Sequence, residues 1–391
     1  MRCVLFVKVV LIIFASLSGI ACNTQSSTSY DDLGVNSSAF TWSVSHMVPL
    51  PVEPEDNPMT EAKFQLGRHL FYDTRLSGNG TQACSSCHEQ EHAFADGLVT
   101  PEGSTGDILA RNSQGLANVA YNATLTWANP SIVTLERQIL IPLFGESPIE
   151  QGINDENRAE VLQRISDDTV YQSLFLSAFP DQGGIINYDN IIKAIASFVR
   201  GMASFDSSFD HYQSGDSSAL TASAQRGREL FFSEKMECFH CHGGYNFSDS
   251  TLDRTMAFVE MPFHNTGLFN IDGTGAYPDD NQGIFSITGK PSDMGKFRAV
   301  SLRNVAVTAP YMHDGSMANL EDVIDFYAAG GRVIEVGPHA GDGRFNPFKD
   351  GFITGFEVSA QEKQDIIAFL ESLTDETFIS SERFSNPWIT Q

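Results

Sequence analysis

The sequence predicts a mainly helical protein of two similar halves connected by long loops. Three observations support this fold class. Apolar residues recur at helical spacing, whereas strand patterns are scarce. The segments FQLGRHLF (64–71) and AQRGRELF (224–231) repeat one another, and each is followed by a C-x-x-C-H motif, at 84–88 and 238–242. The segment 272–296 is rich in Gly, Asp and Asn, which favours a loop.

The first 22 residues have the composition of a secretory signal. Arg2 and Lys8 accompany an apolar stretch, and small residues lie near Ala21. This order and length are typical of a cleaved signal rather than of a bilayer-spanning helix. The segment GIAC (19–22) also resembles a bacterial lipobox, which would place a lipid anchor on Cys22. We therefore expect an exported protein, either periplasmic or anchored in the outer membrane and facing the periplasm.

The full chain has the length and charge of an acidic protein with two domains. Of the 391 residues, 49 are acidic and 24 basic, which gives a formal net charge of −25. This charge excludes a nucleic-acid partner and favours cationic ones. After a flexible leader at 23–50, we expect one domain at 51–215 and a second at 223–375, separated by the linker-like QSGDSSALTA (213–222). Residues 376–391 form a tail with no recognisable pattern.

The motifs CSSCH and CFHCH are open to three interpretations. A structural zinc site or a redox disulfide can use C-x-x-C pairs, but neither requires a histidine directly after each pair. Covalent attachment of a c-type haem uses all three residues, two thiols for the vinyl groups and an imidazole for the iron. We therefore expect two c-type haems, with zinc as the alternative. The attachment residues would be Cys84, Cys87, Cys238 and Cys241, and the iron ligands His88 and His242.

Helical patterns cover the two repeated segments and four further ranges. In the range Leu320–Ala329, apolar side chains recur on one face. Asn319 is suited to cap the start of this helix, and Gly330 is suited to end it. Each half is then expected to be a cytochrome-c-like domain around its own haem, the two domains packing across an interface. The four ranges are Ala159–Phe179, Ile191–Phe205, Leu320–Ala329 and Ala360–Leu373.

From about residue 55 to 375 the chain resembles the di-haem cytochrome c peroxidase / MauG superfamily. The resemblance rests on both C-x-x-C-H motifs and on three further segments: RNSQGLAN (111–118), LERQILIPLFGESPIEQG (135–152) and SLRNVAVTAPYMHDG (301–315). It implies an enzyme that acts on hydrogen peroxide. The branches of the superfamily differ in the ligand on the far side of each iron.

The first haem is expected to be open to peroxide. Reductively activated members of the superfamily carry a distal histidine in the loop after the first motif, but residues 93–210 contain no histidine, and His92 lies too close to its own motif. The resemblance implies Gln138 and Glu150 as the groups that handle the proton of bound peroxide, with Glu146 as the alternative.

The second haem is expected to carry a tyrosine. Its sixth ligand in the superfamily comes from the helix after PYMHDG and is methionine in the peroxidases but tyrosine in MauG-type enzymes. Here 318–331 contains no methionine, and Tyr327 falls both at the ligand position and on the apolar face formed with Leu320, Val323 and Ile324. A phenolate favours ferric and higher oxidation states. The alternative ligands are Met294, Met312 and Met317.

The resemblance also implies a relay between the haems and a calcium ion. Trp127 matches the tryptophan that relays electrons between the two irons. Calcium would be held by the side chain of Asn112, by the backbone oxygens of Thr308 and Pro310, and by waters.

These expectations support three hypotheses. The first is a MauG-type enzyme that oxidises a protein partner, through its Trp or Tyr residues, at long range. The second is a conventional peroxidase that takes electrons from a small cytochrome or cupredoxin, to which an acidic surface is suited. The third is a di-haem electron carrier, for which the first haem would need a distal ligand that the sequence does not offer.

Overall fold

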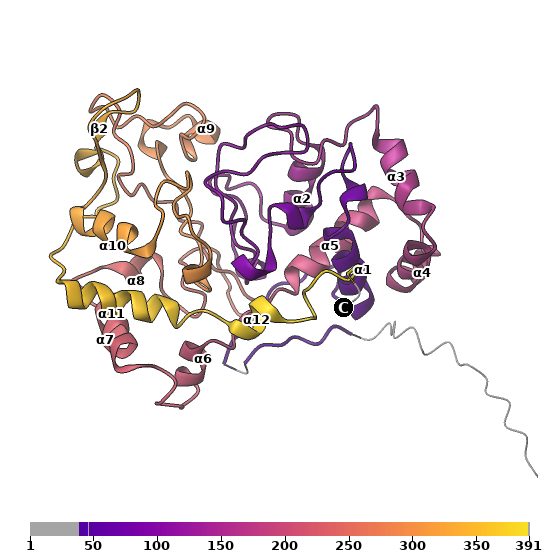
Figure 1. The fold of residues 1–391 in the computed structure, drawn as a ribbon, viewed down its shortest axis with the longest axis horizontal. Helices are drawn as coiled ribbons and strands as arrows, with labels where there is room; N and C mark the ends of the chain where they lie inside the picture. The colour runs from indigo at the N-terminus through magenta and orange to yellow at the C-terminus, as the bar shows by residue number, and fades with distance from the viewer. Residues whose placement is uncertain (1–38, 46, 390–391) are drawn as a thin grey trace, which may run out of the picture. The chain divides into compact units, whose positions relative to one another are not determined.

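Twelve α-helices and one short strand pair form the framework of the described residues. The computed structural model describes residues 39–45 and 47–389 (Figure 1). The predicted signal, Cys22 and most of the predicted leader lie outside this range. The helices are α1 Glu61–Phe71, α2 Leu135–Phe144, α3 Arg158–Ser166, α4 Thr169–Ala178, α5 Tyr188–Arg200, α6 Ser208–Gln213, α7 Ala222–Phe231, α8 Cys238–Cys241, α9 Phe285–Thr288, α10 Leu320–Ala329, α11 Ala360–Glu371 and α12 Glu376–Ser380, and the strands are β1 Val333–Ile334 and β2 Gly341–Asp342.

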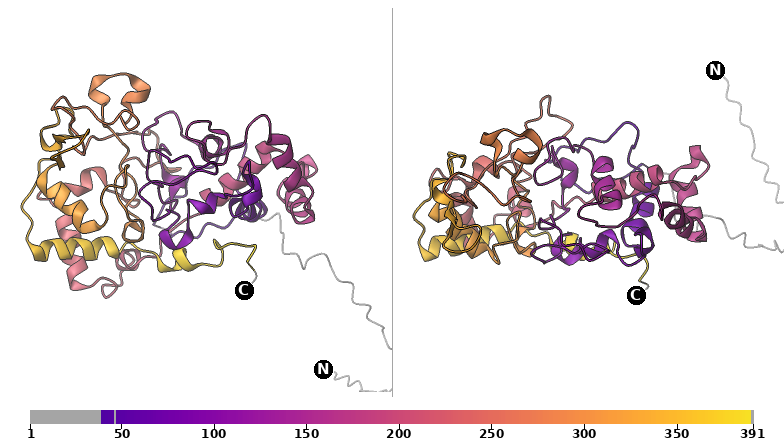
Figure 2. Two further views of the ribbon diagram at one scale, coloured as in Figure 1. Left: turned by 45° about the horizontal axis from the view of Figure 1, so that its top comes forward. Right: turned by 90° about the horizontal axis from the view of Figure 1, so that it is seen from above.

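The sequence repeat returns as a repeated pair of packed helices. Figures 1 and 2 show α1 beside α5 and α7 against α11. Gly67 and Gly227, which are equivalent in the repeat, allow this close approach. A Cβ would lie 1.9 Å from the Ala194 carbonyl oxygen at Gly67, and 1.8 Å from that of Asp365 at Gly227. Only glycine fits either crossing point.

A separate apolar core fills each half. The first core surrounds α1 and α5 and includes Phe64, Phe71 and Phe198. The second surrounds α7 and α11 and includes Phe231 and Phe369. A third, smaller core includes Phe269, Tyr277, Phe297, Met317 and Phe326. The predicted tail continues from α11 through α12 toward the first half (Figure 2). Its Phe378 and Phe384 are buried in the first core.

Two of the expected helix ranges need correction. The range 159–179 holds two helices, α3 and α4, because the side chain of Asp168 accepts a hydrogen bond from the Val170 amide and starts a new helix. The helix expected at 191–205 is α5, which begins at Tyr188 after the cap Asn187 and ends at Arg200, before the cap Gly201. Apolar residues continue beyond both positions, so periodicity alone does not reveal these ends.

Helix α10 forms as predicted, over Leu320–Ala329. Asn319 accepts a hydrogen bond from the Asp322 amide, and Gly330 ends the helix in the left-handed conformation, with a φ of 75°. The long segment 272–296 is mostly loop and contains only α9 and one turn of 3₁₀ helix. Across the described part of the chain, no helix has both the length and the apolar character needed to cross a bilayer.

Candidate functional site

The first C-x-x-C-H motif opens onto a cavity of about 280 Å³. The Nδ1 atom of His88 lies 2.6 Å from the carbonyl oxygen of Phe94, so Nδ1 carries the proton and Nε2 is free to bind a metal. Among the described residues, His88 is the only histidine in the wall of this cavity. The wall also contains Cys84, Cys87, Trp127, Gln138 and Glu150.

Two polar side chains in this wall are suited to exchange a proton or a hydrogen bond with a small bound molecule. Burial raises the pKa of Glu150 to about 7, where a carboxyl group can both accept and return a proton near neutral pH. The side-chain oxygen of Gln138 is buried and has no hydrogen-bond partner. The alternative carboxylate, Glu146, is exposed and does not line the cavity.

The second motif opens onto a cavity of about 220 Å³. His242 has the same arrangement as His88, with its Nδ1 atom 3.1 Å from the carbonyl oxygen of Phe247. All four residues of the predicted α10 stripe line this cavity, Tyr327 included. Of the three methionines considered as alternatives, Met312 lines it, whereas Met294 and Met317 do not. Cys238 and Cys241 lie in the same wall.

Trp127 is common to both cavities. Its ring lines the first and the second cavity, and its Nε1 donates a 2.9 Å hydrogen bond to the backbone oxygen of Asn112. This contact fixes the indole plane where the two walls meet.

A third cavity, of about 80 Å³, brings together the three residues expected to hold calcium. The amide nitrogen of Asn112 donates to the Leu98 carbonyl oxygen at 2.7 Å, which leaves its Oδ1 free. Within the described chain, neither this Oδ1 nor the backbone oxygens of Thr308 and Pro310 accept a hydrogen bond. Three free oxygen donors in one small cavity fit a hard cation.

The geometry argues against a shared zinc site for the cysteines. The two pairs line different cavities, so they cannot form one four-cysteine site. Burial raises the pKa of the Cys84, Cys87 and Cys238 thiols to about 12, so these thiols stay protonated and are poor redox nucleophiles.

The two histidines in or beside the motifs, His92 and His240, lie outside the haem cavities. Within CFHCH, His240 stacks on Phe352, with ring centroids 4.1 Å apart, and pairs with Glu237 at 2.6 Å, so its side chain does not enter the second cavity. His92 approaches the Val307 carbonyl oxygen at 3.2 Å and does not line the first cavity.

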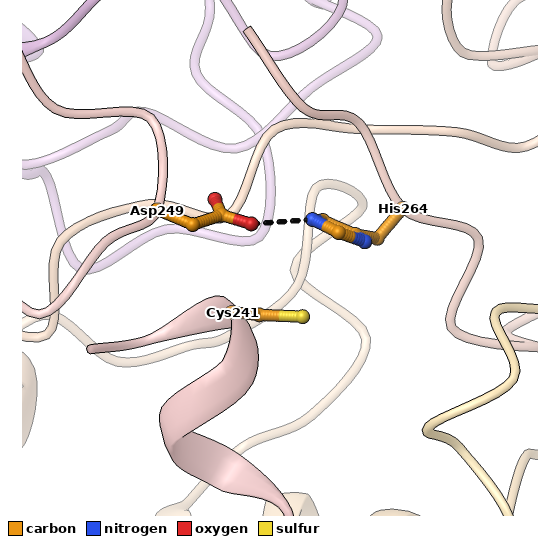
Figure 3. A group of neighbouring side chains, drawn as sticks. All are labelled: Cys241, Asp249 and His264. Atoms are coloured by element: carbon orange, nitrogen blue, oxygen red, sulfur yellow. Dashed lines mark hydrogen bonds and ion pairs between the residues drawn. The ribbon is translucent and has the colours of Figure 1, made fainter. Parts of the chain in front are cut away.

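A charged histidine in the wall of the second cavity was not predicted. His264 approaches Asp249 through Nε2 and Asp350 through Nδ1, each at 2.7 Å, and Figure 3 shows the first of these contacts beside Cys241. Burial lowers the pKa of His264, but its hydrogen bonds to the Asp249 and Asp350 carboxylates outweigh burial and raise the pKa. Both ring nitrogens therefore carry protons, and the group is a fixed cation rather than a metal ligand.

Arg298 is a second cation that sequence reasoning missed. It lines the second and third cavities, is 3% exposed, and its Nη1 is buried without a partner. A buried, unpaired guanidinium nitrogen calls for an anionic group, such as a haem carboxylate. Together with the unpaired Gln138 oxygen and the free Nε2 atoms, it shows that both cavities are suited to a haem.

Comparison with known proteins agrees with this geometry. The model of the family "Di-haem cytochrome c peroxidase" matches residues 61–218. The chain is 35% identical over 342 residues to the cytochrome-c peroxidase IdrP1 of Pseudomonas sp. (strain SCT), covering 83% of this chain and 84% of the relative. It is 31% identical over 323 residues to the methylamine utilization protein MauG of Methylorubrum extorquens, covering 83% and 81%.

A solved structure resembles the whole described fold. The crystal structure of "a MauG-like protein associated with microbial copper homeostasis" superimposes with a TM-score of 0.88 at 55% identity, over 90% of this chain and all of that one. The chain therefore belongs to the di-haem cytochrome c peroxidase family. It is a haem peroxidase acting on hydrogen peroxide, with two c-type haems, and the predicted fold class is confirmed.

Proposed function

We propose that this protein is a MauG-like enzyme that uses hydrogen peroxide to oxidise a protein partner at long range through its two haems. The observation that carries the proposal is the contrast between the two cavity walls. In the described chain, the first wall offers no histidine besides His88, and the second contains Tyr327. When bound, the haems supply the redox chemistry, reacting with peroxide at the first site and storing oxidising equivalents.

The first cavity handles the protons of peroxide. Glu150 accepts a proton from peroxide and returns it to the departing oxygen as water forms, which its pKa of about 7 allows near neutral pH. The Gln138 amide orients the bound peroxide by hydrogen bonding from the same wall. Neither step requires a protein ligand to leave the first iron, so the oxidised protein reacts without prior reduction.

His242 and Tyr327 would hold the second haem, since both line the second cavity. As a phenolate, Tyr327 would supply a hard anionic donor, which favours ferric and higher oxidation states. The site would therefore favour storage of an oxidising equivalent over uptake of an electron from a donor. Trp127, shared by both cavity walls, carries electrons between the sites.

Asn112, Thr308 and Pro310 would hold a calcium ion in the third cavity. Asn112 would contribute its free Oδ1, and its backbone oxygen accepts the 2.9 Å hydrogen bond from Trp127, so the cation site and the relay residue share one segment. Thr308 and Pro310 would contribute backbone oxygens from the other half of the chain.

The partner is proposed to be an exported protein with an oxidisable Trp or Tyr residue. The 55% identity to a MauG-like protein associated with microbial copper homeostasis favours a partner involved in copper handling. Export to the periplasm, with or without a lipid at Cys22, is part of the proposal and rests on the N-terminal sequence.

A second candidate function is a conventional peroxidase that takes electrons from a small cytochrome or cupredoxin. Met312 favours it, because this methionine also lines the second cavity and its thioether would support a haem that accepts electrons. The net charge of −25 suits a basic donor protein.

Stopped-flow absorbance separates the two candidates. The fully oxidised protein and the same protein given one electron per molecule are each mixed with peroxide. The MauG-like proposal predicts a rapid reaction of the fully oxidised form with no added reductant. If only the pre-reduced form reacts, the conventional peroxidase is correct.

A further inference from the structure

We propose that Tyr245 is a redox-active residue of this enzyme, oxidised to a neutral radical while its phenolic proton passes to Asp253. The inference rests on the proposed function, since the oxidising equivalents come from the reaction of peroxide at the haems. It adds a protein-based oxidation site in the loop that follows His242, separate from Trp127.

The position of Tyr245 is fixed close to the proximal ligand of the second haem. His242 approaches the Phe247 carbonyl oxygen at 3.1 Å, which closes a short loop that contains Tyr245. The buried guanidinium of Arg303 donates to the Tyr245 carbonyl oxygen, at 2.7 Å from Nη2 and 3.1 Å from Nε. The backbone that carries this tyrosine is therefore held from both sides, with only a few residues between ring and iron ligand.

The hydroxyl of Tyr245 meets the group that its oxidation requires. It donates a 2.8 Å hydrogen bond to Asp253 Oδ2. Losing an electron makes a phenol strongly acidic, and a half-buried ring cannot hold the resulting positive charge at low cost. A carboxylate already in hydrogen-bond contact takes the proton directly, so a neutral radical forms.

Asp253 is held in its ionised form. It is 2% exposed, and its other oxygen accepts from the amide and hydroxyl of Thr255, at 2.7 and 2.6 Å. These hydrogen bonds and that of Tyr245 outweigh burial and lower the Asp253 pKa. Within the described chain it forms no ion pair with Lys, Arg or His, and the Tyr245 hydroxyl is the donor on Oδ2.

The step balances in atoms and electrons. The Tyr245 ring gives one electron toward the haems that peroxide has oxidised, and its O–H bond breaks as the proton moves to Asp253 Oδ2. The products are a neutral phenoxyl radical and a protonated carboxyl group. Reduction reverses both movements, so the residue can pass an oxidising equivalent onward.

A neighbouring tyrosine provides the matched control. The Tyr121 ring lies edge-on to that of Tyr245, with centroids 5.6 Å apart, and is 1% exposed. Among the described residues its hydroxyl is buried and has no hydrogen-bond partner, so no base is in contact with its proton. The two touching tyrosines thus differ in whether the hydroxyl meets a base.

The test is freeze-quench EPR after mixing the oxidised, haem-loaded protein with peroxide, without a partner. A narrow radical signal should form, and its line shape should change when tyrosine is supplied with a deuterated ring. Its yield should fall by about tenfold or more in Tyr245→Phe and in Asp253→Asn, and stay at the wild-type level in Tyr121→Phe. Haem absorption spectra confirm that each variant is folded and loaded.

Four other results overturn the inference. A wild-type protein whose haem signals respond to peroxide but that gives no tyrosine radical would refute the Tyr245 role and leave the proposed function intact. So would a radical that persists in Tyr245→Phe, or one that is lost equally in Tyr121→Phe. Haem signals that do not respond to peroxide at all would refute both the proposed function and this extension of it.

Discussion

Replacing Glu150 with glutamine should slow the reaction of the oxidised protein with peroxide by about 10²- to 10⁴-fold, the range that a positioned acid–base group contributes. Glutamine keeps the size and shape of the side chain but cannot transfer the proton. Because burial raises the pKa of Glu150 to about 7, the wild-type rate should rise as the pH increases through 7 and then level off. The variant's rate should not show this step.

The same substitution has a calculable effect on stability. The pKa of Glu150 rises from 4.5 in the unfolded chain to about 7 in the folded protein, so ionising it in place costs about 3 kcal/mol. Its contribution to the free energy of unfolding is therefore complete below pH 4.5 and is lost as the pH rises through 7. Relative to wild type, Glu150→Gln should gain up to about 3 kcal/mol above that pH.

Stopped-flow absorbance measures the rate, and urea unfolding at several pH values measures the stability. Glu146→Gln is the matched control, because Glu146 is exposed four residues earlier and lies outside the cavity wall. A Glu150→Gln variant with the wild-type rate and pH profile would refute the assignment. So would an equal loss of rate in Glu146→Gln.

Three further substitutions test the second haem, the cation site and the helix crossing. Tyr327→Met should alter the low-spin EPR signal and raise the midpoint potential of the second haem by on the order of 0.1 V, within the range of about 0.8 V that axial ligands span. Met312→Leu should change neither the signal nor the potential. The reverse pattern would favour the conventional peroxidase. Adding EGTA should lower the free energy of unfolding of wild type by about 3 kcal/mol when calcium was present at 100 times its Kd. Thermal unfolding of Asn112→Ala should be insensitive to the chelator. Equal sensitivity in both proteins would place the cation elsewhere. Gly227→Ala should lower the free energy of unfolding by about 1 to 3 kcal/mol, because its Cβ would lie 1.8 Å from the Asp365 carbonyl oxygen. Gly351→Ala should leave it unchanged, because a Cβ there has no atom within 4 Å. Urea unfolding compares the two variants, and similar values would contradict the close-approach explanation.

Features that depend on local sequence were predictable. The two C-x-x-C-H motifs each open onto a cavity, and α10 has the predicted bounds, cap and apolar face, because capping and periodicity act within a few residues. The residues Asn112, Thr308 and Pro310 were matched through the family resemblance alone, and the structure brings them to one small cavity.

Features that depend on contacts between distant segments were not predictable. His264 is charged because Asp249 and Asp350 converge on it from two other loops. The tail lies against the first core because Phe378 and Phe384 are buried there. No periodicity in 376–391 indicates this packing. The base beside Tyr245 comes from Asp253, eight residues later in an irregular loop whose path the sequence does not define.

The most direct test of the central claim is an EPR spectrum of the fully oxidised protein, recorded before and after stoichiometric peroxide with no reductant present. The oxidised protein should show one high-spin and one low-spin ferric haem, and both signals should disappear when peroxide is added. Two low-spin haems that do not react with peroxide until one electron is supplied would contradict both the open first haem and the Tyr327 ligand.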